Sequence, residues 1–196
     1  MKRVVLIPFI LILMSLWSAK AIGYVIVNPS FENSLTGWVT YNDPGMNRYP
    51  VDTFATDGQY NLQLFTEAGT SNTKGDKSGV YQNVSLTDIP KILFDVKLSP
   101  HYYGEPCVFR DYAALFLVDG TTYWSQTVED TYLNQFVDVS ALSGSHKIEL
   151  RLECIQDENY PPSMWAEWDN LRAIPEPATV LLLGLGGLAL RRKCRE

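Results

Sequence analysis

Two stretches of the chain alternate apolar and polar residues with a period of two. In residues 92–98 the even positions are Ile, Phe, Val and Leu, whereas the odd positions include Asp95 and Lys97. Residues 147–153, Lys-Ile-Glu-Leu-Arg-Leu-Glu, alternate in the same way. This period is typical of β-strands that bury one face. Both stretches are therefore predicted to be half-buried strands.

A third signal predicts a hairpin. Residues 113–118 form a continuous apolar run, which is followed by Asp119-Gly120 and then by Thr121-Thr122-Tyr123-Trp124. A two-residue type I′ turn needs positive φ at both central residues, and Asp-Gly meets that need. The pattern predicts two antiparallel strands joined at Asp119-Gly120.

The rest of the interior also reads as short strands separated by turns, and no window of ten residues keeps a helical period. Eight or nine strands at this spacing indicate an all-β antiparallel sandwich. Long loops in such a fold gather at its ends or along one edge, where ligands bind. The other predicted strands are Tyr24–Asn28, Trp38–Tyr41, Tyr60–Phe65, Val80–Leu86, Gln135–Val139 and Glu167–Ile174. The predicted loops are Asn42–Pro50, Glu67–Gly79, His101–Pro106 and Asp157–Pro162.

The N-terminal end has the pattern of a signal peptide. Met1-Lys2-Arg3 is a basic start, residues 4–17 are apolar, and Ala19-Lys20-Ala21 supplies a small-x-small cleavage pattern. We therefore expect residues 1–21 to be a signal-peptide helix and the mature chain to begin at Ile22. One ordinary domain, residues 22–174, then precedes the C-terminal tail.

The tail, residues 175–196, has three parts in a fixed order: Pro175-Glu176-Pro177, an uncharged apolar run over 178–190, and a basic end with Arg191. Thirteen helical residues rise about 20 Å, which is short for a hydrocarbon layer of about 30 Å. The basic residues should stay in the cytoplasm and the domain should lie outside.

This tail resembles the PEP-CTERM sorting signal of Gram-negative bacteria, which have an exopolysaccharide-linked export system. The resemblance implies that an exosortase recognises Pro175, Glu176 and Pro177 and removes the short transmembrane helix. The protein would then occupy the inner membrane transiently before reaching the cell surface or the extracellular matrix. The alternative is a plain C-terminal membrane anchor after a rigid linker.

Net charge narrows the choice of partner. Residues 22–190 hold nine Lys and Arg but 21 Asp and Glu, which gives the exported part about −12 where the whole chain has −6. Such acidity repels phosphate backbones, so nucleic acid is not expected as a partner.

Three cysteines are divided unevenly: Cys107 and Cys154 lie in the exported domain and Cys194 lies in the basic tail. In an oxidising compartment, Cys107 and Cys154 are predicted to form a disulfide, against the alternative of two buried thiols. A loop of this length gives about 3 to 4 kcal/mol of stabilisation.

Within the domain, several short motifs come in the order found in jelly-roll carbohydrate-binding modules of families 4 and 9 and in galactose-binding-like sandwiches. The motifs are Asn28-Pro29-Ser30-Phe31-Glu32 with Gly37-Trp38, Asp57-Gly58-Gln59-Tyr60-Asn61-Leu62, Val80-Tyr81-Gln82-Asn83-Val84, Val137-Asp138-Val139-Ser140 and Trp168-Asp169-Asn170-Leu171. The series resembles these modules over most of residues 27–174. It implies a jelly-roll fold that binds carbohydrate without catalysis.

The same resemblance implies a structural calcium ion near the first and last strands, with Glu32, Asp57 and Asp169 as ligands. Calcium prefers six to eight oxygen ligands, which carboxylates and carbonyls supply. The alternative is that Glu32 accepts hydrogen bonds in a turn and that Asp169 is an exposed strand residue. No cofactor is otherwise required.

Aromatic residues make up 12% of the chain. Tyr102, Tyr103 and Trp124 stand outside the alternating core pattern and are the candidate platform for a sugar ring. The alternative for Trp124 is a place in the core.

A glycoside hydrolase is the rival class, because Glu167 and Asp169 lie at i and i+2 on a predicted strand and share a face. Sandwich hydrolases have a third acid, but Leu171 and Arg172 stand at that place. His101 and His146 have neither a nucleophile motif nor zinc-ligand spacing beside them. The sequence therefore predicts a non-enzymatic, exported protein that binds extracellular polysaccharide. A structural envelope or matrix protein without glycan binding is the alternative.

Overall fold

A computed structural model describes residues 26–66, 72–101, 111–157 and 163–174. These residues form ten strands. The strands are β1 Val39–Asn42, β2 Met46–Val51, β3 Asn61–Thr66, β4 Lys77–Ser85, β5 Lys91–His101, β6 Tyr112–Val118, β7 Thr121–Gln126, β8 Asp130–Asp138, β9 Ser145–Cys154 and β10 Ser163–Ile174.

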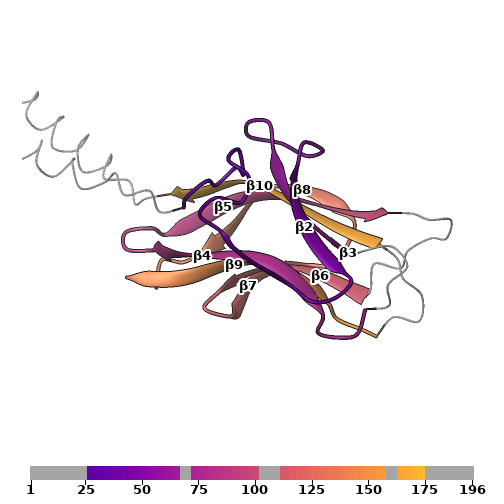
Figure 1. Cartoon of the computed structure of the whole chain (residues 1–196). Helices are drawn as coiled ribbons and strands as arrows, with labels where there is room; N and C mark the ends of the chain where they lie inside the picture. The colour runs from indigo at the N-terminus through magenta and orange to yellow at the C-terminus, as the bar shows by residue number, and fades with distance from the viewer. Residues whose placement is uncertain (1–25, 67–71, 102–110, 158–162, 175–196) are drawn as a thin grey trace, which may run out of the picture.

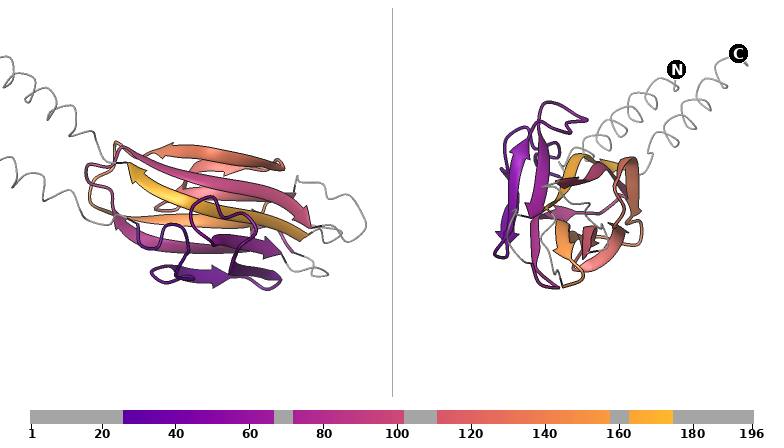
Figure 2. Two further views of the ribbon diagram at one scale, coloured as in Figure 1. Left: turned by 90° about the horizontal axis from the view of Figure 1, so that it is seen from above. Right: turned by 90° about the vertical axis from the view of Figure 1, so that its right-hand side faces the viewer.

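The strands form two five-stranded sheets that pack as layers (Figures 1 and 2). Sheet A has the order β1-β4-β9-β6-β7, and sheet B has the order β2-β3-β10-β5-β8. Every pairing is antiparallel. The predicted all-β, antiparallel β-sandwich is confirmed.

The core lies between the two sheets and follows the period-two pattern. The alternating apolar side chains of β5 and β9 all face inward and are buried. At the centre, Phe94 stacks on Phe116, with 5.1 Å between ring centroids, and contacts Trp168 at 5.5 Å. Because side chains alternate along a strand, the charged residues of β5 and β9 must lie on the outer faces.

The Asp-Gly hairpin is also confirmed. Asp119 and Gly120 have φ values of 49° and 80° between β6 and β7, as a type I′ turn requires. The register of this hairpin shifts near the turn, because Leu117 pairs with Thr122 whereas Phe116 pairs with Trp124.

Two local predictions are wrong. Asn42–Pro50 was expected to be a loop, but Met46–Val51 form β2. Pro50 is tolerated because β2 is an edge strand of sheet B, where a missing amide donor costs no inner ladder bond.

Val27 and Asn28 were expected in a strand but lie in bends. The side chain of Gln82 takes the place of a strand neighbour: its Oε1 accepts from Val27 N at 2.9 Å, and its Nε2 donates to Val27 O at 3.1 Å.

The two ends of the described domain lie close together, since Leu171 N donates to Pro29 O at 3.2 Å. Within residues 26–66, 72–101, 111–157 and 163–174, no helix is long and apolar enough to span a bilayer. The predicted signal-peptide helix and C-terminal transmembrane helix lie outside these residues, and the domain boundaries at Ile22 and Ile174 stay predictions.

Candidate functional site

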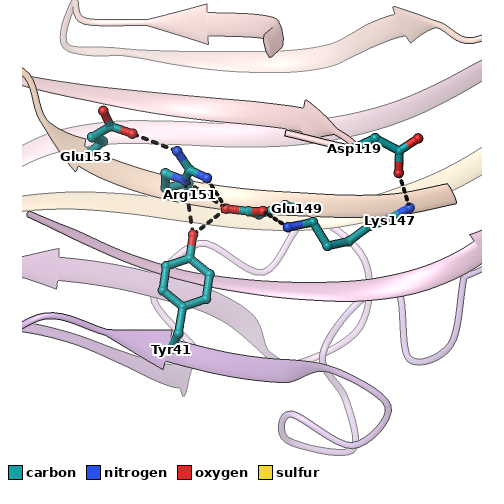
Figure 3. A network of polar contacts seen from close by, with 6 residues as sticks. All are labelled: Tyr41, Asp119, Lys147, Glu149, Arg151 and Glu153. Atoms are coloured by element: carbon teal, nitrogen blue, oxygen red, sulfur yellow. Dashed lines mark hydrogen bonds and ion pairs between the residues drawn. The ribbon is translucent and has the colours of Figure 1, made fainter. Parts of the chain in front are cut away.

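The outer face of sheet A carries a row of charged side chains from β9, together with tyrosines from β1 and β4. We call this surface face A and define it by Tyr41, Tyr81, Lys147, Glu149 and Arg151. Figure 3 shows all of them except Tyr81. Glu149 is at its centre and is only 2% exposed. Since Lys147, Glu149 and Arg151 alternate with the buried core residues of β9, the strand itself places all three on one surface.

Glu149 is held by three neighbours. Its Oε1 accepts from Tyr41 Oη at 2.5 Å and from Arg151 Nε at 2.7 Å, and its Oε2 lies 2.8 Å from Lys147 Nζ. Burial raises the pKa of the Glu149 carboxyl, but these hydrogen bonds and charges lower it more, so the pKa lies below its ordinary value. Glu149 is therefore a fixed anion at neutral pH.

Arg151 is fixed on both sides. Its Nη1 lies 2.8 Å from Glu153 Oε2, and its Nη2 lies 2.5 Å from Glu149 Oε1. A guanidinium has five N–H donors in a rigid fork, so donors remain for a ligand after these contacts.

The tyrosine rings border this charged row. Tyr41 and Tyr81 have ring centroids 6.5 Å apart, and Lys147 Nζ lies 5.1 Å from the Tyr81 ring centroid. Tyr41 lies over Gly79, where a Cβ atom would meet the tyrosine hydroxyl and would stand 2.6 Å from Leu150 O. Gly79 thus makes room for Tyr41 to reach Glu149. Burial, and then the contact with Glu149, raises the pKa of the Tyr41 hydroxyl far above its ordinary value.

The outer face of sheet B has a different character. Glu167 is 1% exposed, accepts a hydrogen bond from Thr53 Oγ1, and lies with its Oε2 3.4 Å from Lys97 Nζ. Asp169 is fully buried beneath the loop of residues 52–60, and its Oδ2 accepts from Asp57 N at 2.8 Å. Both acids of the predicted hydrolase pair are therefore buried on this face, and loop 52–60 supplies a hydrogen bond to each.

The three predicted calcium ligands converge on this same loop. Glu32 Oε1 accepts from Gln59 N and Tyr60 N, each at 2.7 Å, and Asp57 Oδ2 accepts from Ser30 Oγ at 2.7 Å. Among the described residues no group of three acidic, His or Cys side chains has the spacing of a metal site.

One feature of the loop still suits a cation. Asp169 Oδ1 is buried without a hydrogen-bond partner in the described part of the chain, and burial raises the pKa of Asp169 more than the amides of Asp57 and Thr56 lower it. Oxygen donors and an uncompensated carboxylate oxygen fit calcium chemistry. The calcium site stays a prediction.

Of the candidate sugar platform, Tyr102, Tyr103 and Trp124, only Trp124 lies among the described residues. Trp124 is partly buried between the sheets, edge-on to Phe94, Tyr132 and Trp168 at centroid distances of 5.3, 5.9 and 5.6 Å. Tyr102 and Tyr103 lie outside the described residues. The structure thus places Trp124 against the core, and the predicted platform stays a prediction.

The predicted disulfide also stays a prediction, because Cys107 lies outside the described residues. Cys154 is fully buried at the end of β9, with its Sγ 2.9 Å from Gln156 O. A thiol count on the denatured mature protein would test it, and two reactive cysteines in the exported domain would contradict it.

Sequence reasoning missed face A. The alternation of residues 147–153 showed that the charges share a surface, but Tyr41 is 108 residues from Glu149. Their meeting depends on the pairing of β1 with β4 and of β4 with β9, which no local pattern reveals.

Comparison with known families shows that residues 173–193 match the PEP-CTERM protein-sorting motif. This confirms the motif predicted from Pro175, Glu176 and Pro177, and it implies an exported protein that an exosortase processes. The comparison with curated proteins gave no match.

Solved structures similar to the chain are mostly carbohydrate-binding modules. The first of the Caldicellulosiruptor saccharolyticus family 27 modules, in complex with mannohexaose, has 14% identity and a TM-score of 0.51, and the match covers 76% of this chain and 97% of that one. A family 4 module has 10% identity and a TM-score of 0.41, with 77% and 99% covered. A Stig cyclase from Fischerella sp. TAU has 20% identity and a TM-score of 0.45, with 76% and 96% covered. The chain shares the jelly-roll sandwich fold of the family 27 module.

Proposed function

We propose that this chain is an exported, exosortase-processed protein of the cell surface or extracellular matrix, and that face A of its non-catalytic sandwich binds polysaccharide. The observation that carries the proposal is the arrangement around Glu149, where fixed charged groups lie beside two tyrosine rings at the centre of a sheet. The sorting motif and the fold shared with carbohydrate-binding modules support the setting.

The chemistry of face A suits a sugar. Saccharides offer hydroxyl groups that need donors and acceptors in fixed positions, together with C–H faces that pack on aromatic rings. Arg151 and Lys147 offer donors, the ring of Tyr81 offers a flat apolar surface, and the buried Glu149 holds the two cations in place. Because Glu149 and Glu153 balance Lys147 and Arg151, the face has no strong net charge and favours a neutral glycan.

The processing step has its own test. Intact mass of the protein recovered from the native host should show a chain that begins at Ile22 and lacks the tail after Pro175-Glu176-Pro177. A mass that retains Arg191 and the residues after it would contradict exosortase processing and would favour the permanent anchor.

Binding is tested by affinity electrophoresis of the mature protein in gels that contain the extracellular polysaccharide of the host, with mannohexaose as a soluble competitor. Tyr81→Ala should weaken retention about fivefold, because stacking on a ring contributes about 1 kcal/mol. Tyr81→Phe should keep retention, since the ring remains. Tyr60→Ala is the matched control, because Tyr60 is exposed but lies away from face A in the loop before β3.

If Tyr81→Ala migrates as the unmodified protein does, face A is not the binding surface. The second candidate function is a structural matrix protein without glycan binding. It gains support if the unmodified protein is not retarded at all in the gel. One observation favours that candidate: the side chains around Glu149 satisfy one another within the domain.

An enzyme is disfavoured by the same geometry. The carboxylates of Glu167 and Asp169 are 1% and 0% exposed, so neither is open to a glycosidic bond. We therefore propose a binding role and no catalysis for this domain.

A further inference from the structure

The outer face of sheet B carries a second group of aromatic and polar side chains, which the proposed function does not use. We call it face B and define it by Tyr49, Gln63, Phe65, Lys97, Trp165 and Glu167. These residues come from β2, β3, β5 and β10, and strand register brings them together: Phe65 lies opposite Trp165, and Gln63 lies opposite both Glu167 and Tyr49. Five of them alternate with buried residues, and Tyr49 lies opposite Gln63 in the register, so all six are on the outer side of the sheet.

The aromatic part of face B lies at one end. Tyr49 and Phe65 have ring centroids 5.4 Å apart, and Tyr49 is 52% exposed. Trp165 is partly buried beside Phe65. A solvent-facing tyrosine on an edge strand, backed by two further rings, is an exposed aromatic surface of the kind that marks binding sites.

The polar part lies directly beside the rings. Lys97 Nζ is 3.4 Å from Glu167 Oε2, and Gln63 Nε2 donates to Glu167 Oε1 at 3.4 Å. The Lys97 ammonium is about a third exposed and has three donors, so it can reach a ligand while it keeps its ion pair. Ser99, which pairs with Trp165 in the register, has a buried Oγ without a hydrogen-bond partner in the described chain.

We propose that face B is a second polysaccharide-binding surface, so that one domain holds two polysaccharide chains on opposite sides. This inference rests on the proposed function. Rings for stacking and an ammonium whose charge Glu167 balances match a neutral glycan, as on face A. Because the two sheets pack back to back, their outer faces point in opposite directions, and the domain would cross-link the polysaccharide (Figure 2).

The test compares binding with cross-linking, using the mature protein purified from cells and the host's own extracellular polysaccharide as the probe. Affinity electrophoresis measures binding, and turbidity with co-sedimentation of soluble polysaccharide measures cross-linking. The face B variant is Tyr49→Ala, whose exposure makes misfolding a small risk, and Tyr49→Phe is its matched control. The face A variant is Tyr81→Ala, and the double variant carries both changes.

We expect the unmodified protein to cross-link the polysaccharide. Each single variant should still bind, but its apparent affinity for the polymer should fall about fivefold and its cross-linking should weaken, since both sites hold the polymer. The double variant should bind about 25-fold more weakly and should not cross-link, and Tyr49→Phe should behave as the unmodified protein.

Other outcomes separate the two proposals. If Tyr81→Ala weakens binding and Tyr49→Ala changes neither readout, face B is not a site and the proposed function stands. If the unmodified protein does not bind, the proposed function fails and this inference fails with it. If the protein is a dimer in sedimentation without polysaccharide and Tyr49→Ala is a monomer, face B binds a second copy of the chain, which also overturns the inference.

Discussion

Each sheet of the sandwich buries a carboxylate on its outer face, but the two carboxylates have different partners. Glu149 on sheet A contacts Arg151, Lys147 and the Tyr41 hydroxyl, and its pKa is lowered. Asp169 on sheet B accepts only from neutral groups, and its pKa is raised. Burial alone therefore does not fix the state of an acid; the charge of its neighbours does.

The comparison explains why we assign different roles to the two acids. Glu149 is compensated inside the domain, so it can hold Lys147 and Arg151 in fixed positions. Asp169 has an oxygen without a partner in the described residues, which a cation would satisfy, and that end of sheet B is where the domain's two chain ends meet. In the proposed function the first acid supports a recognition surface, and the second would be the anchor of a stabilising ion.

The largest expected effect comes from removing the charge of Glu149. Glu149→Gln should lower the free energy of unfolding by about 2 to 3 kcal/mol, because it leaves Lys147 and Arg151 without their shared anion. Urea unfolding measures the change. Glu153→Gln is the control: Glu153 is 27% exposed, so its loss should cost about 1 kcal/mol or less. Equal effects of both changes would show that burial at Glu149 is not the source of the stability.

Calcium should stabilise the protein through Asp169 on sheet B. Adding calcium at about a hundredfold above its Kd should stabilise the mature protein by about 2 to 3 kcal/mol. Asp169→Asn should remove this response, yet without calcium it should cost little, since the amide oxygen still accepts from Asp57 N. Thermal unfolding with calcium and with a chelator checks both points. A melting temperature that does not respond to calcium would refute the predicted site.

Tyr41→Phe should have a smaller effect. It removes one hydrogen bond to Glu149, while Arg151 and Lys147 remain, so we expect a loss of about 1 to 2 kcal/mol. Gly79→Ala should have a similar cost, because the added Cβ meets the Tyr41 hydroxyl and Leu150 O. Urea unfolding of both variants is the measurement. An unchanged stability for both would mean that Tyr41 does not lie against Glu149.

The smallest expected effect is in the pH dependence, where the two acids act with opposite sign. The lowered pKa of Glu149 stabilises the fold above its unfolded pKa, and this contribution is lost as the pH falls through the folded pKa. The raised pKa of Asp169 stabilises the fold below its unfolded pKa, and this contribution is lost as the pH rises through the folded pKa.

Unfolding free energies between about pH 3 and pH 6, measured without calcium, check these signs. Glu149→Gln should flatten the loss of stability at acid pH, and Asp169→Asn should steepen it. The same slope for both variants would contradict the opposite pKa shifts.

The sequence predicted the sandwich well because its signals are local. Alternation in β5 and β9 and the Asp119-Gly120 turn each depend on neighbours in the chain. The edge strand β2 was missed because Pro44, Gly45 and Pro50 are typical of a loop, and only its place at the edge of sheet B makes Pro50 acceptable.

The surfaces were harder to predict because they are assembled across strands. Tyr81 and Glu149 are paired only through the register of β4 with β9, and Gln63 and Glu167 only through that of β3 with β10. For Trp124 the sequence left open whether the side chain faces a ligand or the core. The shifted register of β6 with β7 decides its direction, and its ring contacts Trp168.

The most direct test of the account is amide chemical-shift mapping of the mature, isotope-labelled protein during titration with oligosaccharides cut from the host's own polysaccharide. The account predicts saturable shifts at Gly79, Tyr81 and Arg151 in the centre of sheet A. Absence of shifts at these three residues, with the protein folded and the oligosaccharide at saturating concentration, would contradict it.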